Sequence, residues 1–330
     1  MIKNNMDKLI VIVGPTASGK SDLAVEIALR LRSGQATSAG SGQAQKPAGE
    51  IISADSRQVY RGMDIGTGKI TKKEMRGIPH YLLDVVSPKT DFNVTKFKKL
   101  ARKKIEEIIS RNHLPIIAGG TGFWIDSLIY NWPIPEIKAD KELRARLEKQ
   151  TIEKLFNKLN KLDPERAKDV QAKNKRRLIR AIEIAIATKG NAPKFDLLAY
   201  YNKTKTQIFE INDKKLKIII IGIKPSITEL EQKIYKRLIS RLNQDMIKEV
   251  KNLHSNGVSW KRLDDFGLEY RWISRYLRGK ISKDEMVENL YRNIRKYARR
   301  QMTWFKRNRN IKWFNKPPKA EDYLKRLLNI

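Results

Sequence analysis

Eight residues near the N-terminus form a pattern that binds phosphate groups. They fit the motif G-x-x-x-x-G-K-[ST] and lie between a short apolar run and an amphipathic segment. Glycines let successive backbone N–H groups turn toward phosphate oxygens, and the N-terminus of the following helix adds positive potential. We expect Lys20 to contact the terminal phosphate and Ser21 to bind Mg²⁺. The predicted diphosphate or triphosphate site comprises Gly14, Pro15, Thr16, Ala17, Ser18, Gly19, Lys20 and Ser21.

Asp55 is a candidate for acid–base or metal chemistry. It follows the apolar run Ile51–Ala54, which we predict to be a strand beside the phosphate-loop strand. Ligands bind at the carboxyl ends of strands in open α/β sheets, and a carboxylate there can accept a proton from a nucleophile. A helix N-cap is the alternative, because Asp and Ser both favour that position. Position alone leaves the two interpretations open.

The phosphate loop by itself also permits a nucleotide-hydrolysing enzyme. Such enzymes hold Mg²⁺ with an Asp at the end of an apolar strand. Asp84, after Leu82 and Leu83, is suitably placed for this role. The other suitable strand, Pro115–Ala118, is followed by Gly-Gly-Thr-Gly and no acid, which weakens this interpretation.

The elements that must position these residues alternate between strands and helices. We predict strands at Leu9–Val13, Ile51–Ala54, Tyr81–Val86 and Pro115–Ala118, and helices at Lys20–Leu31 and Val94–Ser110. This alternation predicts the α/β class, with a mainly parallel sheet like that of phosphate-loop nucleotide-hydrolysing proteins.

Composition divides the chain into three parts. Residues 1–131 would form the first part of the α/β core, with 33–49 as a flexible, catalytically silent insertion because fourteen of its 17 residues are Gly, Ala, Ser or Gln. Residues 132–205 read as a charged helical insertion domain. Residues 206–330 would return to the sheet at Leu216–Ile223 and then form basic C-terminal helices.

The charge balance favours a polyanionic partner. The chain of 330 residues has 69 Lys and Arg against 36 Asp and Glu, a net charge of +33. Nucleic acid is the expected partner, with an anionic membrane surface or a compositional bias as alternatives. The absence of cysteine excludes disulfides and thiolate sites, and no apolar run reaches membrane length, so we expect a soluble, cytoplasmic protein.

Six blocks in order resemble the tRNA dimethylallyltransferase family, which is also called the tRNA isopentenyltransferase or IPP transferase family. They are Gly14–Ser21, Asp55-Ser56 with Tyr60, Asp64–Thr67 with Lys69, Pro79–Asp84, Gly119–Thr121 and Arg300–Phe305. The resemblance spans roughly residues 9–315 without the 33–49 insertion.

The resemblance implies a reaction and roles for several residues. A dimethylallyl group passes from dimethylallyl pyrophosphate to the exocyclic amine of adenosine 37, just 3′ of the tRNA anticodon, with Mg²⁺ present. Asp55 would be the general base, and Thr16 would hydrogen-bond the allylic oxygen. Arg237 would bind the pyrophosphate, with Lys236 and Arg241 as rivals in the alignment. The adenine would reach the site by base flipping.

The resemblance also implies contacts with the anticodon stem-loop. Residues 289–320 contain eleven Lys or Arg and no acid, interleaved with aromatic residues. An amphipathic helix with packed aromatic residues is the alternative there. Glu269 departs from the family's Gly-Tyr-Arg-like pattern and stays unexplained. The predicted tRNA contacts are Asp55, Ser56, Arg57, Gln58, Thr121, Arg144, Arg176, Arg177, Arg180, Tyr270, Arg271, Arg299, Arg300, Gln301, Thr303, Trp304 and Lys306.

Three other functions are compatible with parts of the pattern. A prenyltransferase acting on free adenylate would not need the basic C-terminal segment or the helical insertion. A phosphate-loop kinase, which would bind ATP, fits poorly with the Asp55 block. A non-catalytic RNA-binding protein would not need the intact loop with Lys20 and Ser21. We expect a monomer.

Overall fold

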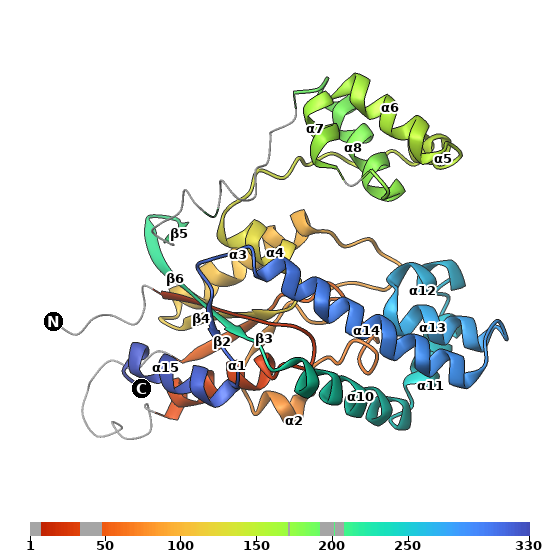
Figure 1. The fold of residues 1–330 in the computed structure, drawn as a ribbon. Helices are drawn as coiled ribbons and strands as arrows, with labels where there is room; N and C mark the ends of the chain where they lie inside the picture. Colours follow the sequence, from red (N-terminus) through yellow and green to blue (C-terminus); the bar gives the residue numbers. More distant parts are fainter. Residues whose placement is uncertain (1–7, 34–47, 171, 192–200, 202–207) are drawn as a thin grey trace. The chain divides into compact units, whose positions relative to one another are not determined.

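The computed structural model describes residues 8–33, 48–170, 172–191, 201 and 208–330. The chain divides into two compact units, which are Met1–Asn131 with Tyr201–Ile330, and Trp132–Tyr200. The first unit contains the sheet and the second contains helices only among its described residues (Figure 1). Residues 34–47 of the predicted insertion lie outside the described residues, and its two ends, Ser33 and Gly49, belong to a helix and a strand.

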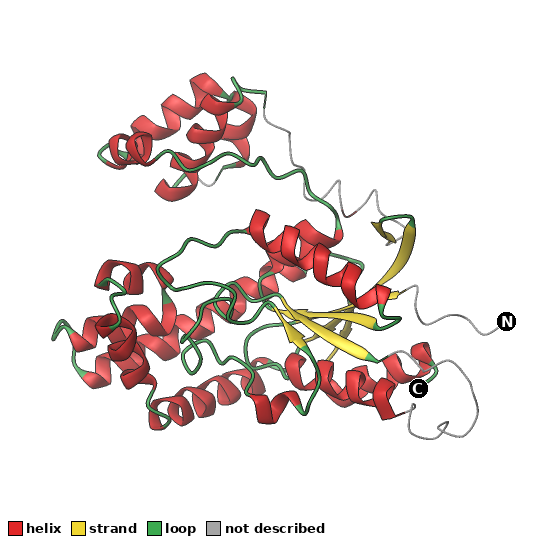
Figure 2. Cartoon of the chain, turned by 180° about the vertical axis from the view of Figure 1, so that it is seen from behind, coloured by secondary structure: helices red, strands yellow, loops and turns green. Residues whose placement is uncertain are grey.

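A seven-stranded sheet forms the centre of the first unit. Its order is β3-β2-β4-β1-β6-β5, with β7 paired to β6. All pairs are parallel except β5 with β6, and helices lie on both faces, which confirms the predicted α/β class (Figure 2). The strands are β1 (Lys8–Val13), β2 (Gly49–Ser53), β3 (His80–Tyr81), β4 (Leu114–Gly119), β5 (Ile208–Ile211), β6 (Lys214–Ile223) and β7 (Lys312–Phe314).

Two strand predictions are wrong. The strand before Asp55 does not lie beside the phosphate-loop strand, because β4 pairs with both β1 and β2 and separates them. The predicted strand Tyr81–Val86 ends at Tyr81, because Leu82 and Asp84 have φ angles of +63° and +54° and turn the chain away. Only an isolated bridge between Tyr60 and Val86 continues the pairing.

Two layers of helices cover the sheet. On one face, α1 (Lys20–Ser33) and α15 (Pro317–Leu328) pack on Ile and Leu side chains of β1, β4 and β6 in one apolar cluster (Figure 1). On the other face lie α3 (Val94–Ser110) and α4 (Gly122–Ile129), whose Phe97 and Trp124 rings stack with centroids 4.7 Å apart. The burial of both sheet faces explains why these strands read as continuous apolar runs.

The C-terminal helices extend from the sheet edge where β1 and β6 end. They are α10 (Ile227–Asn243), α11 (Met246–Ser255), α12 (Trp260–Phe266), α13 (Leu268–Leu277) and α14 (Lys283–Phe305). Capping by Ser226, Ser259 and Ser282 begins α10, α12 and α14. A single turn, α2 (Lys72–Met75), is a further helix among the described residues of this unit.

The second unit is a small helical cluster with its own core. It contains α5 (Lys141–Glu148), α6 (Ile152–Leu162), α7 (Pro164–Asp169) and α8 (Lys175–Ala187). Leu147, Leu155, Leu159, Leu178 and Ile182 are buried together. The predicted boundaries of the insertion, 132–205, differ slightly from those of this unit, because Tyr201 belongs to the first unit.

Among the described residues, none of the helices combines the length and the apolar character that crossing a bilayer requires. The longest, α14, carries charged residues along its whole length.

A buried carboxylate connects distant parts of the first unit. Asp126 of α4 is 3% exposed, and its Oδ2 accepts hydrogen bonds from the Tyr201 hydroxyl and from Trp304 Nε1, each 2.6 Å away. Burial raises the pKa of Asp126 to about 7, although both hydrogen bonds act to lower it. The three residues therefore join α4, the start of the returning chain and α14.

This raised pKa predicts that stability falls as pH rises. Between pH 4 and 7 the folded protein retains a proton on Asp126 that the unfolded chain releases, so stability falls as pH rises through this range and the loss is complete above about pH 7. Asp126→Asn stays uncharged and keeps an oxygen acceptor. We expect it to be more stable than the wild type at pH 8, on the order of 1–4 kcal/mol, and closer to it at pH 5.

Urea unfolding at both pH values measures this difference. Glu288→Gln, at an exposed position on α14, is the control and should show the same small effect at both. An Asp126→Asn variant whose stability relative to wild type does not change with pH would contradict the raised pKa.

Candidate active site

The phosphate loop joins β1 to α1 in the geometry that its glycines allow. Gly19 and Ala17 have φ angles of +85° and +62°. A Cβ at Gly14 would lie 2.7 Å from the carbonyl oxygen of Ile223, so glycine is required there. Lys20 Nζ donates to the carbonyl oxygen of Pro15 at 3.2 Å, which folds the lysine back over the loop. The side chain is thus held where a phosphate would lie.

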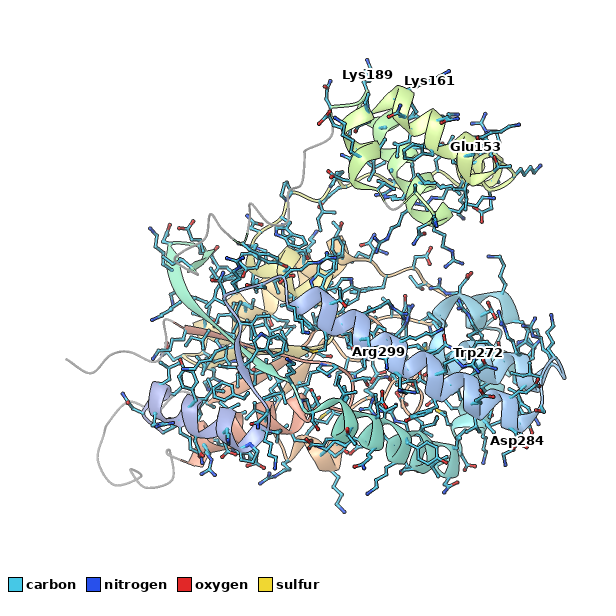
Figure 3. All side chains as sticks on the ribbon, in the orientation of Figure 1. Glu153, Lys161, Lys189, Trp272, Asp284 and Arg299 are labelled. Carbon is cyan, nitrogen blue, oxygen red and sulfur yellow. The ribbon has the colours of Figure 1, made fainter. Side chains whose placement is uncertain are left out.

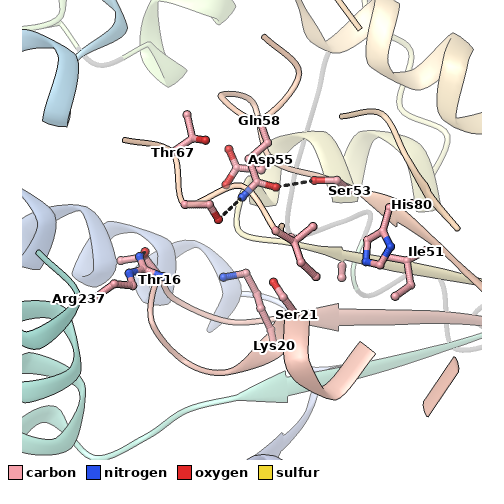
Figure 4. Close-up of a pocket in the computed structure, with 14 residues that line it drawn as sticks. Thr16, Lys20, Ser21, Ile51, Ser53, Asp55, Gln58, Thr67, His80 and Arg237 are labelled. Atoms are coloured by element: carbon pink, nitrogen blue, oxygen red, sulfur yellow. Dashed lines mark hydrogen bonds between the residues drawn. The ribbon is translucent and has the colours of Figure 1, made fainter. Parts of the chain in front are cut away.

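A cavity opens over this loop at the carboxyl ends of β1, β2 and β4. Figure 4 shows Lys20, Ser21 and Thr16 on its floor, with Asp55 and Gln58 opposite. Its lining residues are Thr16, Lys20, Ser21, Ile51, Ser53, Asp55, Gln58, Thr67, Gly68, Ile70, His80, Ala118, Gly119 and Arg237. The structure therefore brings together the loop, Asp55 and Arg237, which are far apart in the sequence.

Asp55 lies in the turn after β2 rather than at the N-cap of a regular helix. Its Oδ1 accepts the Arg57 N–H at 2.8 Å, which fixes the side chain in a turn. The next residue, Ser56, donates its N–H to Thr121 Oγ at 3.0 Å, so the loops after β2 and β4 are joined. Asp55 is therefore held in the cavity wall with one carboxylate oxygen bonded to its own loop.

Arg237 is the arginine of α10 that reaches the loop. Its guanidinium donates to Thr16 Oγ1, and both side chains line the cavity. Of the two rivals, Lys236 is exposed and does not line the cavity, whereas Arg241 lies one turn further along α10, against the Gly66 carbonyl oxygen at 3.5 Å. The structure thus favours Arg237 as the residue beside the phosphate loop.

The cavity has an excess of buried positive charge. Burial, with Arg237 nearby, lowers the pKa of Lys20 to about 8. Burial, with Arg241 nearby, lowers the pKa of Arg237 to about 10. Asp55 and Glu269 oppose these shifts but do not cancel them. An anionic ligand would supply the missing negative charge, and it would bind most tightly when Lys20 is protonated.

A second cavity continues from the first. The two share Thr16, Lys20, Asp55, Thr67 and Arg237. The second cavity is additionally lined by Ser56, Arg57, Gly66, Arg241, Asp265, Phe266, Gly267, Leu268, Glu269, Arg271, Asn293, Ile294, Tyr297, Arg300 and Gln301. Asp55 therefore faces a basic phosphate site on one side and a larger, arginine-rich space with aromatic side chains on the other.

Glu269, unexplained by the sequence, is buried in the wall of this second cavity. It is 8% exposed, and its Oε1 lies 3.8 Å from Arg241 NH1. Burial raises the pKa of its carboxyl. An acid at this position therefore faces the inner arginines of α10 and not an open RNA-binding surface.

Sequence analysis missed Glu249, which organises one wall of the site. Its carboxylate accepts the backbone N–H groups of Asp64, Ile65 and Gly66 at 2.8, 2.6 and 3.1 Å. It also accepts the Tyr270 hydroxyl at 2.8 Å. A glutamate in a charged helix gives no sequence signal for such a role, because it reads as a solvated residue.

Several predicted RNA contacts lie inside the protein. Tyr270 is 2% exposed and holds the loop through Glu249, and its RNA contact stays a prediction. Gln301 is 6% exposed and bonded at both ends of its amide, and Gln58 bonds Ser53 and Gly68. Trp304 is half-buried on Asp126. All four therefore already make hydrogen bonds within the protein.

The remaining predicted contacts divide by unit. On α14 of the first unit, Arg299, Arg300, Thr303 and Lys306 are exposed, and Arg299 is labelled in Figure 3. In the second unit, Arg176 and Arg177 are exposed, whereas Arg144 and Arg180 both bind the buried carboxylate of Glu183. Arg271 bonds Asp264, and Arg57 lies over the Phe266 ring. Their RNA contacts stay predictions.

The side-chain oxygens near the phosphate loop suit a metal ion that is bound mainly by the phosphate oxygens of a ligand. Among the described residues, no cluster of three or more His, Cys, Asp or Glu side chains could hold a metal ion. Asp84 binds Lys69 at 2.5 Å and does not line the cavity, which argues against it as a metal ligand. Ser21 and Asp55 are the oxygen donors beside the loop, and Mg²⁺ needs few protein ligands when it binds a diphosphate.

Comparison with known proteins decides the family. The family model described as IPP transferase matches residues 58–308. The chain belongs to this family. It is 42% identical to the tRNA dimethylallyltransferase of Acetivibrio thermocellus, over 94% of this chain and 92% of that protein.

Two solved structures of IPP transferases resemble the whole chain. The full-length tRNA isopentenylpyrophosphate transferase from Bacillus halodurans is 32% identical, with a TM-score of 0.66 over 98% of this chain and 97% of that one. The tRNA isopentenylpyrophosphate transferase from Staphylococcus epidermidis is 35% identical, with a TM-score of 0.66 over 97% and 98%. The family resemblance that the motifs indicated is confirmed.

The contacts of Glu249 predict that it stabilises the loop in the wall of the site without binding the ligand itself. Glu249→Ala leaves three loop N–H groups and the Tyr270 hydroxyl without their acceptor. We expect the variant to bind inorganic pyrophosphate about 10-fold more weakly and to melt at a lower temperature. Calorimetric titration and thermal unfolding measure the two effects. Glu288→Ala is the control, and equal behaviour of both variants would contradict the role of Glu249.

Proposed function

We propose that this protein is a tRNA dimethylallyltransferase, which transfers a dimethylallyl group from dimethylallyl pyrophosphate to the exocyclic amine of an adenosine in tRNA. Membership of the IPP transferase family supports the proposal. The observation that carries it is the joining of two cavities at Asp55, one over the phosphate loop and one lined by arginines and aromatic side chains. Such an arrangement suits a transfer between two substrates that meet at one carboxylate.

The phosphate-loop cavity would bind the donor. Loop N–H groups and Lys20 would hold the pyrophosphate, and Ser21 would help to hold Mg²⁺, which supplies further positive charge when bound. Arg237 donates to Thr16 Oγ1, which leaves the Thr16 hydroxyl proton for the allylic oxygen of the donor. That hydrogen bond strengthens as the carbon–oxygen bond breaks and charge grows on the leaving pyrophosphate.

The second cavity would receive the adenosine. Arg57, Arg271 and Arg300 line it and suit RNA phosphates, and the Tyr297 ring lies in its wall. As the amine nitrogen bonds to the allylic carbon it becomes positively charged. Asp55 then takes a proton from that nitrogen, so the products are the alkylated adenosine and pyrophosphate.

Finer features of the proposal follow the family resemblance. The target would be adenosine 37 in the anticodon loop, with the exposed arginines of α8 and α14 contacting the surrounding RNA. We expect the protein to act as a monomer in the cytoplasm with Mg²⁺. Because many cations would meet phosphates, RNA binding should weaken as salt rises.

A transfer assay tests the proposal. The protein is incubated with Mg²⁺, dimethylallyl pyrophosphate and either unmodified tRNA or AMP, and the digested nucleosides are analysed by mass spectrometry. We expect one dimethylallyl group on adenosine from tRNA and none on AMP. Asp55→Asn, which removes the base but keeps the shape, should lower kcat about 100-fold or more with little change in tRNA affinity.

The other outcomes each name a different function. Alkylated AMP would move the protein to transferases of free nucleotides. Rapid ATP turnover without transfer would indicate a kinase or an ATP-hydrolysing enzyme. An Asp55→Asn variant with full transfer activity would contradict the role of Asp55 as the base while leaving the overall reaction in place.

A further inference from the structure

Gln301 is the one polar residue in the buried stripe of α14. The other buried members of this helix are Met286, Leu290, Ile294, Ala298 and Phe305, which recur every three or four residues as a core-facing stripe does. A polar side chain in such a stripe loses its contact with water. It is retained at low energetic cost only where other groups satisfy its hydrogen bonds.

Both ends of the Gln301 amide are bonded to catalytic loops. Its Oε1 accepts the Thr16 N–H at 2.9 Å, and its Nε2 donates to the Gly120 carbonyl oxygen at 2.9 Å. Thr16 belongs to the phosphate loop after β1, and Gly120 to the loop after β4. A Cβ at Gly120 would lie 2.2 Å from Gln301 Nε2, so the two loops leave a space that this amide fills.

We infer that Gln301 is a positioning residue that sets the place of Thr16 in the phosphate loop. This inference rests on the proposed function for its catalytic consequence. Thr16 is held on two sides, with its backbone N–H on Gln301 and its hydroxyl on Arg237. The direction of the hydroxyl toward the leaving oxygen therefore depends on a helix far along the chain from the loop.

The chemistry of the amide explains why glutamine is suited to this position. One side chain must accept a hydrogen bond from an N–H and donate one to a carbonyl oxygen, and the planar amide of glutamine does both from its two terminal atoms. A glutamate would keep the contact with Thr16 but oppose the Gly120 oxygen with its charge. A leucine of similar size would lose both contacts.

Kinetic analysis of Gln301→Leu and Gln301→Glu tests the inference. We expect Gln301→Leu to lower kcat roughly 10- to 100-fold at saturating substrates, because a misplaced Thr16 hydroxyl stabilises the leaving pyrophosphate poorly. We expect its tRNA dissociation constant, measured without donor, to change less than about twofold. Gln301→Glu should raise the KM for dimethylallyl pyrophosphate as well, because it adds negative charge beside the loop.

Two comparison variants separate this role from the others. Gln244→Leu, at an exposed glutamine near the end of α10, should leave kcat and KM unchanged. Arg299→Gln should weaken tRNA binding. If Gln301→Leu instead behaved like Arg299→Gln, the residue would be an RNA contact and the positioning role would be wrong.

A purely structural role has a different signature. It would lower the melting temperature of Gln301→Leu while the kcat per folded molecule stayed at the wild-type value, and this result would overturn the inference. Binding of inorganic pyrophosphate, measured by calorimetry, gives a readout that does not need the transfer reaction. If the wild type transferred no dimethylallyl group, the proposed function would be wrong. Weaker pyrophosphate binding by Gln301→Leu than by the wild type would still support the role of Gln301 in positioning the loop.

Discussion

The burial of like charges beside the phosphate loop is the constraint on which the rest of the structure depends. Lys20 and Arg237 lie together at the end of the sheet, and burial lowers the pKa of both. Repulsion from Arg237 adds to the shift of Lys20, and repulsion from Arg241 adds to the shift of Arg237. Such a cluster is unfavourable until an anion arrives. The surrounding loops must therefore be held by their own hydrogen bonds, and not by a ligand that is present only part of the time.

Helix α14 provides much of that support because it has two different faces. Its buried face carries Gln301, which bonds the loops after β1 and β4, and the half-buried Trp304, which bonds Asp126. Its exposed face carries Arg299 and Arg300. In a helix, residues one position apart point in different directions, so the motif Arg300-Gln301 combines a surface cation with an internal contact. One short motif can thus serve both RNA binding and site geometry.

Motifs of residues close together in the sequence predicted the parts of the site that such residues form on their own. The phosphate loop and its flanking strand and helix were predicted from the spacing of Gly14, Gly19 and Lys20, and the family motifs singled out Asp55 and Arg237. The sequence order of strands does not determine their order in a sheet, so the position of β4 between β1 and β2 was not predictable. The apolar run after Tyr81 suggested a strand, but the chain turns there. The turn requires positive φ angles at Leu82 and Asp84, and because non-glycine residues seldom adopt such angles, the sequence gives no sign of it.

Long-range partners account for the other differences. The roles of Glu249 and Gln301 are defined by loops 183 and 285 residues away in sequence, and residue type alone predicts solvent or RNA for both. The net charge of +33 likewise does not show which cations are exposed, because part of the positive charge forms ion pairs within the protein.

Two groups among those internal pairs share a pattern, in which a single acid binds two arginines. Glu183 binds Arg144 and Arg180, and Asp264 binds Arg271 and Arg275. Each group keeps a net positive charge while the acid restricts the movement of both guanidinium groups. Restricting flexible side chains before binding lowers the entropy that association must overcome. In these two groups the acid therefore arranges the arginines as well as partly neutralising them.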